Sequence, residues 1–161
     1  MAVDTIADAE KFIKKWMSDR GYLSGELRPD GIAFQLNGKF DTGVSFSIIQ
    51  PQNLMRSFVV VAQIDIHSSH LKAIQSMSDE ELSKFLWGLR RDLFFAIPSF
   101  AFIPAGADVP NAIQFNKQIS FDELTEGKLY NTVEYTCRCV LWVALVLTGK
   151  FGQPIEEESH E

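Results

Sequence analysis

The stretch that decides the fold reads Cys139-Val140-Leu141-Trp142-Val143-Ala144-Leu145-Val146-Leu147. It continues a helical pattern whose apolar side is formed by Leu129, Val133, Thr136, Val140, Val143 and Leu147. A surface helix of a globular protein needs one apolar stripe, whereas nine consecutive apolar residues leave no polar face. The stretch is also only about half as long as a bilayer span requires. We therefore expect a helix that is buried on two sides, against its own core or against a second chain.

This last helix is predicted to begin near Ser120 or Thr125 and to end at Gly149, with Lys150 favourable at its C-terminus. The face opposite the main stripe changes character along the helix. It first carries Asn131, Glu134 and Arg138, and one or two turns later Leu141, Trp142 and Leu145.

The N-terminal part of the chain reads as one helix followed by strands. Thr5 and Asp8 resemble a capping box, and an apolar stripe at helical spacing predicts a helix over residues 5–20. From residue 22 to residue 67 the apolar residues alternate with a period of two, which predicts an antiparallel meander. Its strands are expected at 22–27, 32–36, 44–49 and 58–66, with a hairpin turn at Asn37-Gly38.

A helical turn or two is expected at 69–75, before a longer middle helix. Ser78 and Glu81 form a capping box, and the stripe that follows predicts a helix over Glu80 to Ile97, ended by Pro98. Phe100 and Phe102 then alternate into a short strand, and Ile113, Phe115, Lys117 and Ile119 into a last one.

These elements predict the α+β class. The order is α-β-β-β(-β)-α-β-β-α, with an antiparallel sheet of five or six strands, three main helices on one face and the other face partly open. Residues 1–152 are predicted to form a single domain. Residues 153–161 are predicted to be an acidic, disordered tail.

Composition excludes several classes of function. The net charge is −6, but the tail holds four Glu, and the remaining −2 offers no basic footprint for nucleic acid. The chain has two Cys, no secretory segment near Met1 and no apolar stretch of about 18 residues. We expect a cytoplasmic protein without a membrane span and without a cofactor.

Aromatic residues outside the main stripes are the strongest functional signal. Trp87 and Phe94 lie off the stripe of the middle helix, seven residues apart and close to Arg91. Trp, Phe and Arg are enriched at the centres of protein interfaces. Either a thick core wraps these helices on two sides, or the side chains meet a subunit or partner. Under the second interpretation the candidate interface residues are Trp87, Arg91, Phe94, Phe100, Phe102 and Trp142.

The alternative is a metal-dependent or acid/base enzyme that uses Asp65, His67 and His70, the only His/carboxylate cluster. Strand-end and helix-cap roles are the simpler explanation of these three residues. Cys137 and Cys139 point about 200° apart on a helix, so they are expected to be two small buried residues. A weaker alternative is a small-ligand pocket near Trp142.

The stretch from Ile113 to Leu124 and the order of elements resemble the type III secretion chaperone fold. The chain is similar to an uncharacterised archaeal family of unknown function that shares this fold. The resemblance implies a small acidic homodimer that binds an extended or unfolded segment of another protein, with no enzymatic activity. In that family the middle helix and the strand after it form the dimer; here they are Glu80 to Ile97 and Phe100 to Ile103. The chain departs from the family's layout by an extra strand at Phe58 to Ile66.

Overall fold

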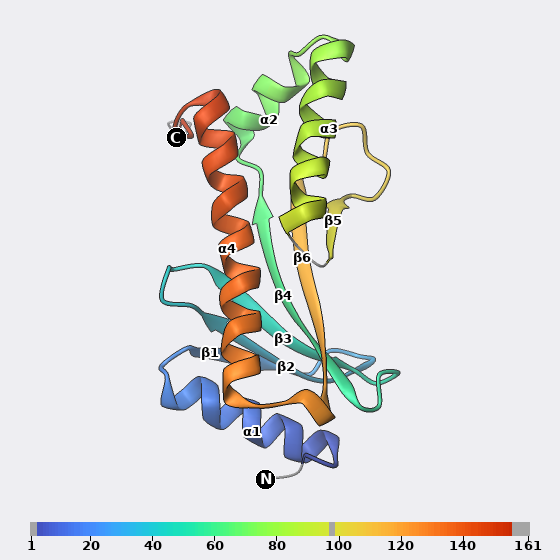
Figure 1. Ribbon diagram of the computed structural model, residues 1–161, viewed down its shortest axis with the longest axis vertical. Helices are drawn as coiled ribbons and strands as arrows, with labels where there is room; N and C mark the ends of the chain where they lie inside the picture. Colours follow the sequence, from blue (N-terminus) through green and yellow to red (C-terminus); the bar gives the residue numbers. More distant parts are fainter. Residues whose placement is uncertain (1–2, 97–98, 156–161) are drawn as a thin grey trace, which may run out of the picture.

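The computed structural model describes residues 3–96 and 99–155 (Figure 1). Four α-helices, one short 3-10 helix and six strands follow one another along these residues. In chain order they are α1 (Ile6–Asp19), β1 (Leu23–Leu27), β2 (Ile32–Lys39), β3 (Ser45–Pro51), β4 (Ser57–Asp65), α2 (Ser68–Gln75), α3 (Asp79–Ala96), β5 (Phe100–Ile103), β6 (Ala112–Ser120), η1 (Phe121–Glu123) and α4 (Glu126–Phe151). The predicted α+β class and element order are confirmed, and α2 joins the three main helices.

The strands form one antiparallel sheet in the order β1-β2-β3-β4-β6-β5. Cross-strand partners place Leu36, Ile48 and Val60 in one row, and all three are buried. The helices cover this face: Figure 1 shows α4 running along β4, α3 beside β5 and β6, and α1 across the end of the molecule far from α2. None of the described helices covers the opposite face, where Ile49, Val59 and Val61 are half-buried, in agreement with the predicted partly open face.

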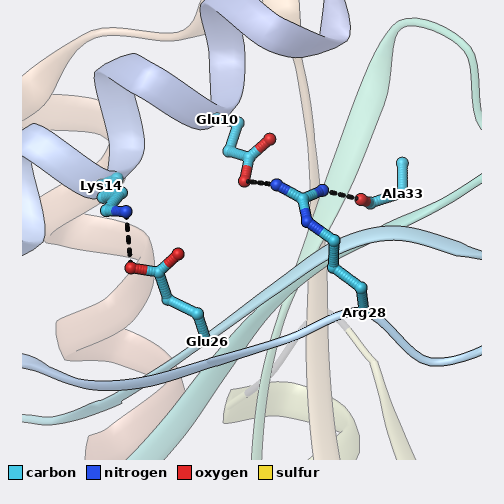
Figure 2. Close-up of polar contacts among 5 residues, drawn as sticks. All are labelled: Glu10, Lys14, Glu26, Arg28 and Ala33. Atoms are coloured by element: carbon cyan, nitrogen blue, oxygen red, sulfur yellow. Dashed lines mark hydrogen bonds and ion pairs between the residues drawn. The ribbon is translucent and has the colours of Figure 1, made fainter.

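Helix α1 begins where the capping pattern predicts. The Asp8 N–H donates to Thr5 Oγ1 (3.1 Å), and the Thr5 hydroxyl donates back to Asp8 Oδ2 (2.7 Å). Ion pairs join the helix to the sheet at Lys14–Glu26 (2.6 Å) and Glu10–Arg28, and Arg28 also donates to the Ala33 carbonyl (Figure 2). Because these charges remain partly exposed, they orient α1 more than they stabilise it.

The predicted hairpin turn at Asn37-Gly38 is wrong. Both residues lie inside β2, where Asn37 pairs with Ser47 and Gly38 pairs with Phe46, and the chain turns after Phe40 instead. A Cβ on Gly38 would lie 2.7 Å from Met17 Cε and 2.7 Å from Phe46 Cζ. This glycine therefore allows α1 to pack closely on the sheet.

The predicted end of the last helix at Gly149 is also wrong, because α4 continues to Phe151 and ends at Gly152, whose φ is 84°. The Phe151 ring packs against His70 (centroids 5.8 Å apart) and Phe85 (5.5 Å). A glycine within a helix costs only about 1 kcal/mol relative to alanine, which this burial offsets.

The predicted apolar stripe of the last helix is confirmed, since Leu129, Val133, Thr136, Val140, Val143 and Leu147 are all buried. By length and composition alone, α4 is the one helix within 3–96 and 99–155 that is able to cross a membrane. Core helices pass the same test, and α4 has nine buried residues. At the chain end, the Ile155 N–H donates to Ser69 Oγ (3.2 Å); residues 156–161 of the predicted tail lie outside the described residues.

Candidate protein-binding surface on helix α3

Helix α3 begins at the predicted capping box. The Ser78 N–H and hydroxyl both donate to Glu81 Oε2 (3.0 and 2.8 Å), and the Glu81 N–H lies 3.4 Å from Ser78 Oγ. The backbone N–H of Ser78 and then its hydroxyl lower the pKa of Glu81, because both bonds favour the charged carboxylate. The cap fixes where α3 starts and therefore which side chains face the sheet.

The inner side of α3 is buried at Leu86, Leu89 and Leu93. The outer side carries Trp87 and Phe94, which are 68% and 74% exposed. Residues 87, 91 and 94 share one side of a helix, and we call Trp87, Arg91 and Phe94 the α3 stripe. The core thus covers α3 on one side only, which excludes the interpretation that a thick core encloses Trp87 and Phe94.

A groove of about 610 Å³ adjoins the α3 stripe. It lies between α3 and the loop that joins β5 to β6, and its lining includes Leu82, Leu86, Trp87 and Arg90 on the helix side. Gly106, Ala107 and Asp108 form the loop side. The exposed Trp87 ring is therefore continuous with a hollow that a partner can fill.

The remaining predicted interface residues lie deeper. Phe100 and Phe102 are half-buried on the helix-covered face of β5, with ring centroids 5.8 Å apart, and the Arg90 guanidinium lies 4.7 Å above the Phe102 ring. Trp142 is half-buried on α4 and packs against the core. Of the predicted interface residues, Trp87 and Phe94 are therefore the exposed aromatic side chains.

Asp65, His67 and His70 all line one small pocket of about 90 Å³, and each forms a hydrogen bond within the fold. His67 caps α2, because its Nδ1 accepts the Ser69 N–H (3.2 Å). The buried His70 donates from Nε2 to the Gly152 carbonyl (2.9 Å), and Asp65 accepts from Gln63 Nε2 (2.7 Å). Within residues 3–96 and 99–155, no group of three His, Cys, Asp or Glu side chains is placed to hold a metal.

Both cysteines are buried and free, as the helical spacing predicts. Burial, with a smaller effect of Cys139, raises the pKa of Cys137 to about 12, and burial raises the pKa of Cys139 to about 11. The Cys139 thiol also donates to the Tyr135 carbonyl (3.0 Å).

We expect the native thiols to react slowly with Ellman's reagent at pH 8, because their thiolate is roughly 100-fold to 1000-fold scarcer than that of an ordinary cysteine. The rate should rise as the pH approaches the raised pKa values. Both thiols should react at once in guanidinium chloride, which serves as the control. Native thiols that react as fast as free cysteine would contradict the buried placement.

The fold is that of an α+β protein with a six-stranded antiparallel sheet, and its long helix α4 runs along one face of that sheet. The chain belongs to the family of uncharacterized conserved proteins DUF2299, whose pattern matches residues 9–147. A comparison with curated proteins finds no match.

Two crystal structures share the fold. One is that of an uncharacterized protein from Methanothermobacter thermautotrophicus, with a TM-score of 0.83 and 23% identity, covering 89% of this chain and 99% of that one. The other is YbjN from E. coli, with a TM-score of 0.50 and 13% identity, covering 89% and 96%. The predicted resemblance to an uncharacterised family with a type III secretion chaperone-like fold is confirmed.

Proposed function

We propose that this protein is a non-enzymatic, cytoplasmic protein-binding module that acts as a homodimer through the α3 stripe. One observation carries the proposal: Trp87 and Phe94 are 68% and 74% exposed on the same side of one helix. Leaving two large aromatic side chains in water is costly, and such patches on monomers usually mark interaction sites. Two free cysteines are in keeping with a reducing compartment.

The area of this surface suits a second copy of the chain. A symmetric dimer brings four such rings together, and an aromatic residue buries about 150–250 Å². Because Trp87 and Phe94 are 68% and 74% exposed in one chain, the four rings supply roughly 400–700 Å² of the 1,200–2,000 Å² that a specific interface buries. The walls of the adjoining groove supply more, and Arg91 adds a residue type that interfaces favour. The chaperone-like activity, binding an extended segment of another protein, is supported by the fold resemblance.

The test replaces the exposed rings without touching the core. We expect the double variant Trp87→Gln, Phe94→Gln to run with half the wild-type mass in size-exclusion chromatography with light scattering, and to keep its circular dichroism spectrum. Because each subunit loses both rings, four in all, the dimer should weaken by at least about 3–5 kcal/mol, which is more than a hundredfold in Kd.

The matched control is Met55→Gln, because Met55 is 75% exposed but lies in the turn before β4. This variant should keep the wild-type mass. A double variant that is folded and retains the wild-type mass would show that the α3 stripe is not the interface.

A further inference from the structure

Strand β6 contains a lysine in a row of core residues. Side chains of a strand alternate between faces, so Phe115, Lys117 and Ile119 point to the same, helix-covered face. Phe115 and Ile119 are fully buried, and Lys117 between them is half-buried. Its cross-strand partner Val60 is also fully buried.

Lys117 lines a groove between β6 and the first half of α4, and this groove has a volume of about 260 Å³. The groove is lined by Phe115, Asn116, Lys117, Lys128, Asn131, Thr132, Tyr135, Thr136 and Cys139. Two of these residues are cationic, and none is a carboxylate. Among residues 3–96 and 99–155, neither lysine forms an ion pair.

This arrangement of charge favours an anion. Two cationic side chains line the groove and no carboxylate does, so a bound carboxylate gains attraction to both lysines without repulsion from the walls. The N-cap and first two residues of α4 are not part of the groove, because Thr125, Glu126 and Gly127 do not line it. The two lysine side chains therefore provide the positive charge of the groove.

The uncharged residues of the lining indicate what kind of molecule the anionic group is attached to. Phe115, Tyr135 and Cys139 offer apolar surface, and the amide of Asn131 offers a neutral donor. The hydroxyls of Thr132 and Thr136 donate to the carbonyls of Lys128 (2.8 Å) and Thr132 (2.7 Å), so they have no proton left for a ligand. A ligand with a negative end and a short apolar body complements these walls.

We propose that the groove between β6 and α4 binds a carboxylate attached to a small apolar body, held by Lys117 and Lys128. The carboxylate belongs to a free organic acid or to an acidic side chain of a bound polypeptide. The site lies on α4 and β6, apart from the α3 stripe. Binding of the carboxylate can therefore be tested independently of the proposed dimer.

The experiment titrates the ¹⁵N-labelled full chain with hexanoate and with hexanamide, its neutral analogue. We expect hexanoate to shift the amide signals of Lys117, Asn131 and Tyr135 in a saturable way. Hexanamide should bind at least about tenfold more weakly, and added salt should reduce only the hexanoate affinity. Equal affinities for acid and amide would overturn the proposal.

Variants locate the binding. Lys117→Gln should weaken hexanoate binding by at least about tenfold, and Lys128→Gln should weaken it less because Lys128 is exposed. If the Lys117→Gln variant does not fold, Lys117→Met replaces it, because methionine keeps the apolar part of the side chain and removes only the charge. Lys39→Gln, on the exposed end of β2, is the matched control and should bind like wild type. Unchanged affinity in a folded Lys117 variant would overturn the site.

A second arm distinguishes the sources of the carboxylate. The blocked peptides acetyl-Val-Glu-Val-amide and acetyl-Val-Gln-Val-amide are titrated in the same way. If the Glu peptide binds more tightly than hexanoate, the site takes an acidic side chain; if hexanoate binds more tightly, it takes a free acid. No shift with either acid up to about 10 mM would overturn the proposal.

Discussion

The Phe58→Ala variant is expected to lose about 3–5 kcal/mol of unfolding free energy, the largest effect of any single substitution proposed for this protein. Phe58 is fully buried on the helix-covered face of β4, opposite Ile119 of β6. Truncating the ring removes its burial and leaves a cavity in a close-packed layer. Because domains are stable by about 5–15 kcal/mol, this loss should be visible in urea unfolding curves.

Two variants calibrate that measurement. Phe58→Leu keeps most of the volume and should cost less than half as much. Met55→Ala, which removes a 75% exposed side chain, should change the stability by no more than about 0.5 kcal/mol. All curves need one protein concentration, since a dimer couples stability to association. A loss below about 1 kcal/mol for Phe58→Ala would contradict the placement of the core.

The Gly38→Ala variant is expected to lose about 1–3 kcal/mol through overpacking. The added methyl group would lie 2.7 Å from Met17 Cε and 2.7 Å from Phe46 Cζ. The Met17 end can move, but the Phe46 ring is itself buried in the core. Urea unfolding, monitored by circular dichroism, measures the loss.

Gly25→Ala is the matched control, because Gly25 also lies in a strand but a Cβ there meets no atom within 4 Å. It should be neutral within about 0.5 kcal/mol. Phe46→Leu should relieve the crowding, so that the double variant with Gly38→Ala costs less than the sum of the two single changes. Strictly additive costs would show that the Phe46 ring is not what the methyl group meets.

Most of the fold follows from patterns that are local in the sequence. Thr5 with Asp8 and Ser78 with Glu81 fix the starts of two helices through bonds between residues three apart. The alternation through 32–66 gives the strands and their buried faces. Trp87 and Phe94 stand out because they lie off their own helix's apolar stripe, which local spacing reveals.

The errors arise where distant residues decide the local structure. The Asn-Gly pair at residues 37 and 38 is a strong turn signal. Gly38 instead lies inside a strand, where the side chains of Met17 on α1 and Phe46 on β3 leave no room for a Cβ. Gly149 is a reasonable helix end, yet Phe151 has aromatic neighbours on α2 and α3 that extend the helix past it. No local pattern reveals such contacts.

The groove on β6 was missed for a different reason. Its signal was present in the sequence, since Lys117 interrupts the alternating core row between Phe115 and Ile119. The second lysine, Lys128, becomes its neighbour on the groove only when α4 folds back along the sheet.

Sedimentation equilibrium of the unmodified full chain tests most directly whether the exposed apolar side of α3 forms a homodimer. We predict a mass twice that of the 18.2 kDa chain at micromolar concentration. A mass of 18.2 kDa that does not change as the concentration rises would contradict the proposed homodimer.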